Sequence, residues 1–398
     1  MTAATKKPGF WAIFSIFLLL GLTSFGGPAA HIGYFRQQFV SKRRWLSDAE
    51  FASLLALCQF LPGPASSQLG MAIGLLQHKF RGALAAWLGF TLPSALLMLA
   101  FALSLTWWQP GLLSGVLHGL KLVAVAVVAQ AIWAMAQSLC NSVRKAVIML
   151  LSAALILWQQ AATVQLLLLA GAALAGFLLL RHETASDSRV ALVQPLQRRQ
   201  GLGFAAVFLL LLLGLPLTAQ YFAQPMLTLL DIFYRSGALV FGGGHVVLPL
   251  LQAELVPAAL VNADQFMAGY AAAQAMPGPL FSFAAFVGAV AQTGISPVTA
   301  AVLALLAIFL PSLLILCAVL PYWQQISQQS ALRSAFAGVG AAVTGLLLAT
   351  LYSPLASSSI LTPLDAAFAV LAFIALQFLR LPPWLLVLAG AVTGILLA

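Results

Sequence analysis

Residues 59–64 read Gln59-Phe60-Leu61-Pro62-Gly63-Pro64, and residues 274–279 repeat the pattern as Gln274-Ala275-Met276-Pro277-Gly278-Pro279. Two other motifs recur in the same order. Phe25-Gly26-Gly27 returns as Phe241-Gly242-Gly243, and Leu92-Pro93-Ser94 returns as Leu310-Pro311-Ser312. The sequence offset between partners is almost constant, from 215 to 218 residues. Ordered matches at a constant offset predict that the chain is built from two related halves.

Composition places the chain in a lipid bilayer. Of its 398 residues, 62% are hydrophobic and 7% are charged, whereas about 25% of the residues of a soluble domain are charged. A membrane-spanning helix needs roughly 20 apolar residues. We count about thirteen apolar segments of that order or somewhat shorter, namely 10–33, 50–77, 83–106, 112–139, 146–160, 163–180, 203–222, 226–251, 265–292, 297–321, 331–352, 364–379 and 383–398. The sequence therefore predicts an all-α polytopic membrane protein.

The repeat and the loop charges divide the chain into three parts. We predict a first repeat at 1–180, a basic loop with one linking apolar segment at 181–222, and a second repeat at 223–398. Because Lys and Arg concentrate in cytoplasmic loops, we expect the N-terminus and the loop 181–200 to face the cytoplasm. A single apolar segment, 203–222, lies between two halves of six segments each. If every segment crosses, the second half therefore begins on the opposite side of the membrane from the first. The sequence therefore predicts inverted-topology repeats.

The charges around the first two segments favour broken or re-entrant hairpins. If 10–33 and 50–77 both crossed fully, the basic residues at 36 and 42–44 would lie outside, against the positive-inside rule. Segments that dip in and return keep all these charges cytoplasmic. The matching hairpin at 226–292 has no Lys or Arg between 236 and 332, as an outward-facing copy should. Both hairpins share a helix start, because Ser47-x-x-Glu50 and Asn262-x-x-Gln265 have capping-box spacing.

The proline and glycine breaks in these hairpins form the predicted anion site. Proline lacks a backbone donor and glycine adopts positive φ easily, so both motifs interrupt helices and free backbone N–H groups. Those groups must face protein or water, and the N-terminus of each half-helix attracts anions. The predicted site residues are Gly26, Gly27, Gln59, Pro62, Gly63, Pro64, Ser66, Ser67, Lys121, Gly242, Gly243, Gln274, Pro277, Gly278 and Pro279. The alternative is that glycine permits close helix packing and proline makes a tolerated kink.

Five charged or titratable residues lie within or beside apolar segments. Lys121 is roughly 13 Å into segment 112–139 at 1.5 Å per residue, and it either lines the anion path or snorkels to an interface. Arg235 follows Asp231 by one helical turn, which suits an ion pair as well as an anion contact. Arg36 is an anion contact or a topology anchor. His31 and His245 could carry protons near neutral pH, or they are satisfied core residues.

These motifs together resemble the chromate ion transporter family, in its two-domain, long-chain type. The resemblance covers almost the whole chain and rests on residues 22–31, 43–46, 57–68, 241–245 and 275–279. Lys121 also stands where this family usually has a lysine. Leu19 and His245 depart from the family pattern, so the half-sites are not expected to be strictly alike. The resemblance implies an inner-membrane secondary transporter that exports chromate with the proton-motive force and gives chromate resistance.

The implied partners are chromate or sulfate as a small inorganic oxyanion, protons and the lipid bilayer. Nucleic acid is not expected, and a homodimer stays open. No cofactor, metal site or catalytic residue is predicted, because the three cysteines are single and neither Gly-x-Ser-x-Gly nor His-Glu-x-x-His occurs. A cation transporter usually buries carboxylates at mid-membrane, whereas these eight Asp and Glu residues lie mainly in loops or at segment ends. A transporter of sulfate or another oxyanion and a passive anion channel remain as alternatives.

Overall fold

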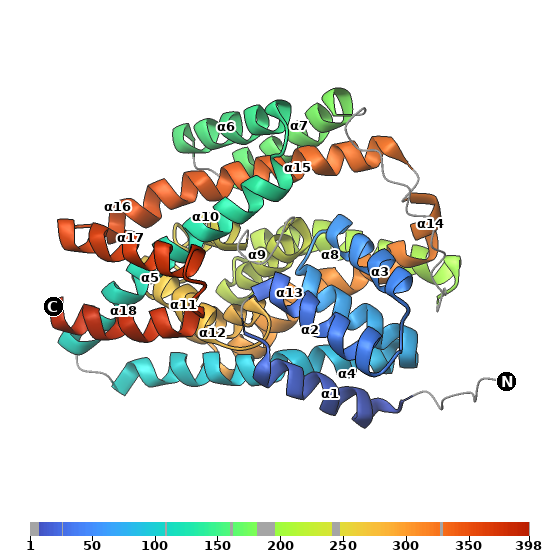
Figure 1. Cartoon of the computed structure of the whole chain (residues 1–398), viewed down its shortest axis with the longest axis horizontal. Helices are drawn as coiled ribbons and strands as arrows, with labels where there is room; N and C mark the ends of the chain where they lie inside the picture. Colours follow the sequence, from blue (N-terminus) through green and yellow to red (C-terminus); the bar gives the residue numbers. More distant parts are fainter. Residues whose placement is uncertain are drawn as a thin grey trace.

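The computed structural model of this chain is a bundle of helices (Figure 1). It describes residues 8–25, 27–107, 110–159, 162–180, 196–240, 247–326 and 329–397, and within these ranges no residue lies in a β-strand. The all-α prediction is thereby confirmed. The first half contains α1 Phe10–Thr23, α2 Gly27–Arg36, α3 Asp48–Phe60, α4 Ala65–Ser104, α5 Pro110–Leu139, α6 Val143–Trp158 and α7 Ala162–Leu179.

One linking helix, α8 Arg198–Phe222, connects the two halves. The second half follows the same order of main helices, with α12 and α13 in place of the kinked α4 and with two additional short helices, α14 and α16. Its helices are α9 Pro225–Leu239, α10 Val247–Leu255, α11 Ala263–Ala275, α12 Phe283–Val290, α13 Pro297–Val319, α14 Trp323–Ile326, α15 Ser330–Thr350, α16 Ser357–Ser359, α17 Pro363–Gln377 and α18 Pro383–Leu397. A 3-10 helix, η4 Leu280–Ser282, precedes α12, and a π-helix, η6 Leu351–Ala356, precedes α16. The element order therefore follows the repeated motifs.

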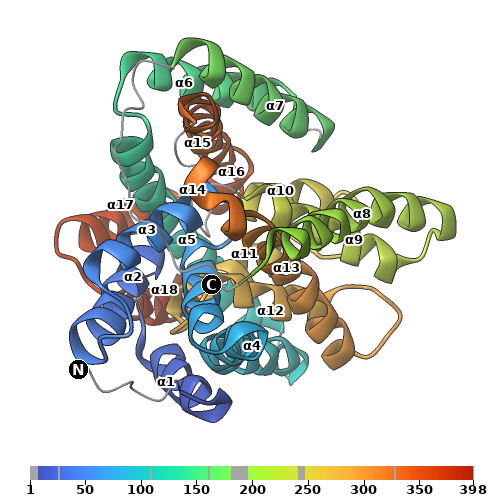
Figure 2. The ribbon, with the colours of Figure 1, turned by 90° about the vertical axis from the view of Figure 1, so that its right-hand side faces the viewer.

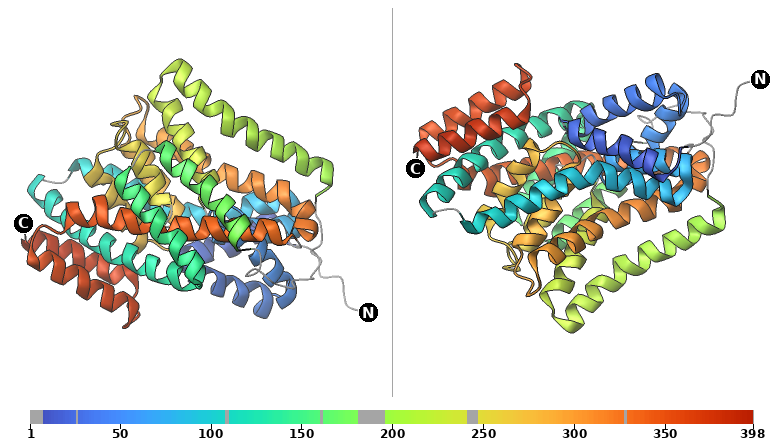
Figure 3. Two further views of the ribbon diagram at one scale, coloured as in Figure 1. Left: turned by 90° about the horizontal axis from the view of Figure 1, so that it is seen from above. Right: turned by 90° about the horizontal axis from the view of Figure 1, so that it is seen from below.

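Five helical stretches are long and apolar enough to cross a membrane by length and composition. They are Ala65–Ser104, Ser114–Leu139, Arg198–Phe222, Pro297–Ile326 and Ser330–Ser359, and shorter apolar helices such as α1, α17 and part of α18 accompany them. Only 6% of the apolar window of α8 is buried, and Figure 3 shows this helix along the outside of the bundle. Such an apolar, uncovered helix is suited to contact lipid.

The two predicted hairpins contain helices that are too short to cross alone. α1 has 14 residues and α3 has 13, which at 1.5 Å per residue gives each about 20 Å against a hydrocarbon core of about 30 Å. α4 is itself interrupted, because His78 and Lys79 leave helical φ and ψ, so its first part ends near residue 77. These lengths are what broken or re-entrant segments require.

Both predicted helix caps are present, but only the cap of α3 has both bonds of a capping box. The Ser47 side chain accepts from the backbone N–H of Glu50, and the Glu50 carboxylate accepts from the backbone N–H of Ser47, which confirms the capping box. The Asn262 side chain accepts from the backbone N–H groups of Asp264 and Gln265. α11 is therefore capped by Asn262, and the reciprocal bond is formed at α3.

The ends of the two halves are interlocked. α6 and α7 of the first half pack on α15 of the second, while α17 and α18 of the second half pack on α5 of the first (Figures 1 and 2). Glycines make both contacts close: a Cβ on Gly338 would meet the backbone of Ala172, and a Cβ on Gly119 would meet the backbone of Gly390. Small residues of this kind let helix backbones approach in membranes. Each half is therefore held by the other.

Candidate functional site

The glycine of each Pro-Gly-Pro break bonds to the other half of the molecule. The Gly63 N–H donates to the Val240 carbonyl at 2.6 Å, and the Gly278 N–H donates to the Ser24 carbonyl at 3.0 Å. Ser24 follows α1 and Val240 follows α9, each just ahead of a Phe-Gly-Gly motif. Both glycines have positive φ, +123° at Gly63 and +93° at Gly278, which favours glycine over other residues. The two donors are thus used in reciprocal backbone bonds.

The third repeated motif supplies the surface on which each break packs. A Cβ on Gly63 would meet the hydroxyl of Ser312, and a Cβ on Gly278 would lie 3.0 Å from the hydroxyl of Ser94. These serines end the matching Leu-Pro-Ser motifs on α13 and α4. The contacts explain why the motifs recur together, because each Pro-Gly-Pro needs the Leu-Pro-Ser of the opposite half.

His31 joins the two breaks into one cluster. Its Nε2 lies 3.2 Å from the Ser24 carbonyl, the same oxygen that accepts from Gly278, and its Nδ1 lies 3.3 Å from the Ser66 hydroxyl. Because a carbonyl only accepts, Nε2 donates and Nδ1 accepts from Ser66. Ser66 lies three residues after Gly63, so the buried imidazole links the Ser24 carbonyl, which bonds to Gly278, to the helix turn that follows the first break. His31 is therefore a buried residue with hydrogen-bond partners at both ring nitrogens, beside both breaks.

Polar groups suited to an anion surround the start of α4. This helix begins after Pro64 with no side-chain cap, so its first backbone N–H groups keep their capacity to bind a negative group. The hydroxyls of Ser24, Ser67 and Ser312 are buried and form no hydrogen bond among the described residues. An unpaired buried hydroxyl is costly. A bound oxyanion would accept from such donors.

The remaining predicted break residues are placed unequally. Gly27 begins α2 with φ of +74°, whereas Gly26, Gly242, Gly243 and His245 lie outside the described residues. Pro62, Pro64, Pro277 and Pro279 are buried. Gln59 is exposed on α3, but Gln274 is half-buried on α11 and shares a hydrogen bond with Tyr270. The two glutamines therefore do not form equivalent walls.

The three predicted cations all have carboxylate partners. Arg36 is exposed and pairs with Asp48 at 2.7 Å, which suits a topology anchor. The Lys121 Nζ lies 2.9 Å from the Asp264 carboxylate. Asp264 is 143 residues away in the chain, so a search near Lys121 in the sequence does not find it.

Arg235 is held between two acids. Its guanidinium donates to Asp231 at 2.8 and 2.7 Å and to Glu254 at 2.9 and 2.5 Å. The three side chains are 19%, 7% and 20% exposed, so this is a largely buried triad with one surplus negative charge. The ion-pair interpretation of Arg235 is the one that the geometry supports.

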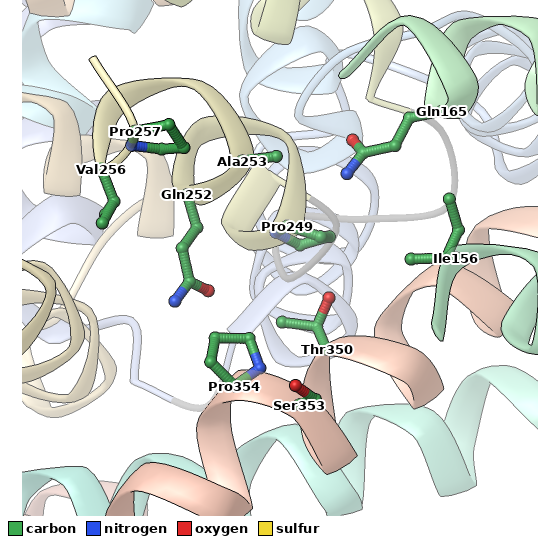
Figure 4. Close-up of a pocket in the computed structure, with 10 residues that line it drawn as sticks. All are labelled: Ile156, Gln165, Pro249, Gln252, Ala253, Val256, Pro257, Thr350, Ser353 and Pro354. Atoms are coloured by element: carbon green, nitrogen blue, oxygen red, sulfur yellow. The ribbon is translucent and has the colours of Figure 1, made fainter. Parts of the chain in front are cut away.

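A cavity with a mainly apolar lining and four polar side chains lies away from the breaks, between α10, η6 and the α6–α7 hairpin. Its volume is about 180 Å³ and none of the break residues lines it. Figure 4 shows the amides of Gln165 and Gln252 reaching into it from different elements, with Thr350 and Ser353 on the opposite wall. The Oε1 atom of Gln252 is buried and has no hydrogen-bond partner in the part of the chain that the structure describes. Sequence motifs gave no signal for this cavity, because its residues are ordinary and distant in the chain.

Comparison with known proteins gives one consistent result. The family model for the chromate transporter matches residues 11–177 and again residues 227–395. A chromate transport protein of Pseudomonas aeruginosa is 29% identical over 357 residues, which cover 88% of this chain and 82% of that protein. A chromate transport protein of Cupriavidus metallidurans is 28% identical over 389 residues, which cover 95% of this chain and 91% of that protein.

A probable chromate transport protein of Synechococcus elongatus is 28% identical over 346 residues, which cover 83% of this chain and 81% of that protein. No solved structure matches this chain. The two separate matches to one family model fall on the two repeats inferred from the motifs.

Proposed function

Because the chain belongs to the chromate transporter family, we propose that it is a secondary transporter that exports chromate across the inner membrane, driven by the proton-motive force, and so confers chromate resistance. The observation that carries the proposal is the chain of hydrogen bonds from Gly278 through Ser24 and His31 to Ser66, which stands three residues after Gly63. It supports a single polar site built by both halves. A transport protein, and not an enzyme, is what the family relationship implies.

The proposed site recognises the oxyanion with neutral donors. The serine hydroxyls at 24, 67 and 312 and the uncapped N-terminus of α4 offer hydrogen bonds without burying several cations, which would be costly. Four acceptor oxygens on a tetrahedral dianion suit donors that converge from different helices. Chromate and sulfate have similar size, shape and charge, so such a site should discriminate between them only modestly.

The proposed mechanism is alternating access between two inverted repeats. In this proposal the N-terminus and loop 181–200 face the cytoplasm and 252–264 faces the other side, because Lys and Arg concentrate in cytoplasmic loops. Reciprocal bonds between the breaks mean that moving one half must rearrange the surroundings of both glycines. A site shared in this way can face each side in turn while the repeats rock against one another.

Flux measurements in proteoliposomes test this function. Purified full-length protein should accumulate chromate against its gradient when a pH gradient is imposed, and sulfate and molybdate should compete at comparable concentrations. Downhill flux that no pH gradient can drive uphill would identify a passive channel. Sulfate flux without chromate flux would identify a sulfate transporter, and absence of any oxyanion flux would refute the proposal.

A single hydroxyl can be tested in the same assay. Ser67→Ala removes one donor, worth about 0.5–1.5 kcal/mol net, so chromate affinity should fall by about tenfold or less. Ser15→Ala is a matched control, because Ser15 is exposed and its hydroxyl bonds only within its own helix turn, to the Ala12 carbonyl. Equal losses in both variants would argue against a site at the start of α4.

A further inference from the structure

A histidine and an aspartate from different halves meet at the edge of a cavity. The Nε2 atom of His118, on α5, lies 2.9 Å from the Oδ1 atom of Asp365, on α17. The His118 side chain is 23% exposed and that of Asp365 is 3% exposed. Both residues line a cavity of about 640 Å³, and Ser114, Thr362 and Gly394 also line it. The pair can therefore exchange protons with water while it joins the two halves.

The surroundings of Asp365 keep its carboxylate ionised. Its Oδ2 atom accepts from the backbone N–H groups of Leu361 at 3.0 Å and Thr362 at 2.8 Å. It also stands in the first turn of α17, where the helix dipole favours a negative charge. An ionised carboxylate only accepts, so His118 Nε2 carries a hydrogen and donates it to Oδ1. Nδ1 is then the atom that takes up an incoming proton.

The charges around this pair are balanced only when His118 is protonated. One helical turn further along α5, Lys121 is paired with Asp264 of α11. The other elements packed on α5 are α15, α16, α18 and η6, and among their described residues the only charged side chain is Arg333, near the start of α15. Tyr270 of α11 and Tyr352 of η6 are the remaining titratable groups. Two carboxylates thus face Lys121 and His118, and a proton on His118 removes the surplus negative charge.

This arrangement occurs on one side of the repeat only. The close glycine contacts of Gly119 and Gly338 match α5 to α15, and this register puts Ala337 at the position of His118 and Gly340 at that of Lys121. Ser142 caps α6 as Thr362 caps α17, which puts Lys145 at the position of Asp365. The His118–Asp365 pair, called the dyad below, therefore has no counterpart at the matching positions of the other half.

We propose that His118, positioned by Asp365, is the proton-binding residue that couples chromate export to the pH gradient; this rests on the proposed function. Positive-inside loops put the starts of α5 and α17 near the extracytoplasmic face, where the proton-motive force supplies protons. A proton from water there binds His118 Nδ1 as the oxyanion leaves. In the state open to the cytoplasm, the same proton passes from Nδ1 to water and the dyad regains its negative charge.

The test uses full-length protein in proteoliposomes and compares His118→Gln with His78→Gln. Glutamine keeps an N–H for Asp365 but takes up no proton, and His78 lies at the α4 kink, away from the dyad in the chain. We expect pH-driven chromate accumulation to be at least tenfold lower in His118→Gln than in the parent protein, while the rate of chromate–chromate exchange stays within twofold of the parent value. Its exchange rate should also lose its dependence on pH, and His78→Gln should behave as the parent protein.

Asp365→Asn provides a second, independent readout. Without the carboxylate the imidazole loses the acceptor that orients its Nε2–H, so pH-driven chromate accumulation should fall severalfold while chromate–chromate exchange stays within twofold. Unchanged accumulation in His118→Gln would overturn the inference, as would equal loss of accumulation and exchange with a lower melting temperature. If the parent protein moves chromate but no pH gradient drives it, proton coupling itself fails, whereas the chromate site stands.

Discussion

The two halves of the molecule share their backbone breaks but not their charges. Gly63 and Gly278 have positive φ, donate to the opposite half and pack on matching serines. The first half has Ser15, Leu19 and Gln38 where the motif offset puts Asp231, Arg235 and Glu254 of the second half. Only α5 carries the ion pairs to Asp264 and Asp365.

This difference separates two roles. In the proposed mechanism the substrate site is presented to both sides of the membrane, so its backbone elements would have to work equally well in both halves. Coupling and directionality need a difference between the two sides, which a symmetric set of charges would not provide. We therefore expect substitutions in the breaks to affect both halves alike, and substitutions of charged groups to act on one half.

The largest expected effect comes from removing the cation of the second-half triad. Arg235→Met leaves Asp231 and Glu254 buried without a partner, and breaking a buried pair costs about 3–5 kcal/mol. The protein should unfold at a much lower temperature or fail to accumulate in the membrane. Leu19→Met changes the matching position of the first half and should have almost no effect, which a thermal unfolding assay in detergent can compare.

The combined variant Asp231→Asn, Arg235→Met, Glu254→Gln sharpens this test. It removes all three charges together, so most of the lost stability should return. If the combined variant is as unstable as Arg235→Met, the stability of this region comes from packing and not from charge pairing.

The glycine breaks should give the next largest effect, and in both halves. Alanine at positive φ costs roughly 1–2 kcal/mol, and a Cβ on Gly63 would also meet Ser312 and Gln68. We expect chromate transport to fall at least tenfold in Gly63→Ala, and somewhat less in Gly278→Ala, where the nearest atom is 3.0 Å away. Gly33→Ala, in open space on α2, should transport normally; normal flux in both break variants would contradict the proposed site.

A smaller effect is expected from Lys121. Lys121→Met should reduce chromate flux about tenfold, roughly 1.4 kcal/mol, while folding is kept, if the lysine supplies positive charge to the anion path. Asp264→Asn frees the lysine and should leave flux within threefold. Equal losses from the two substitutions would show that the ion pair matters for structure, and normal flux in Lys121→Met would leave Lys121 without a role in transport.

The sequence predicted the backbone features of this protein well. Pro, Gly and capping residues act locally, so the break between α1 and α2, the breaks at Gly63 and Gly278 and the cap at Ser47 could be inferred from a few adjacent residues. The apolar segments were equally visible, because lipid leaves no choice but helices for such long stretches.

Long-range partners could not be predicted in the same way. The contacts of Lys121 with Asp264 and of His118 with Asp365 span 143 and 247 residues, and nothing near either residue indicates its partner. Motif symmetry also suggested that Gln59 and Gln274 are equivalent, yet one is exposed and the other is not. Side-chain environments depend on which helices pack together, and here they pack across the halves.

The smallest expected effect on activity belongs to a test of the inverted orientation itself. With Cys58, Cys140 and Cys317 replaced, single cysteines at Gln38, Ser188 and Ala258 should leave chromate flux within twofold. In intact cells an impermeant thiol reagent should label position 258 and spare 38 and 188, because the basic loops are expected inside; permeabilised cells should label all three. Ala258 suits this test because it is exposed beside α10, at the position that mirrors the basic stretch after α2. Labelling of position 188 from outside would reverse the orientation of the chain, and labelling of 38 together with 258 would show that the two hairpins enter from the same face, so that the halves are parallel and not inverted.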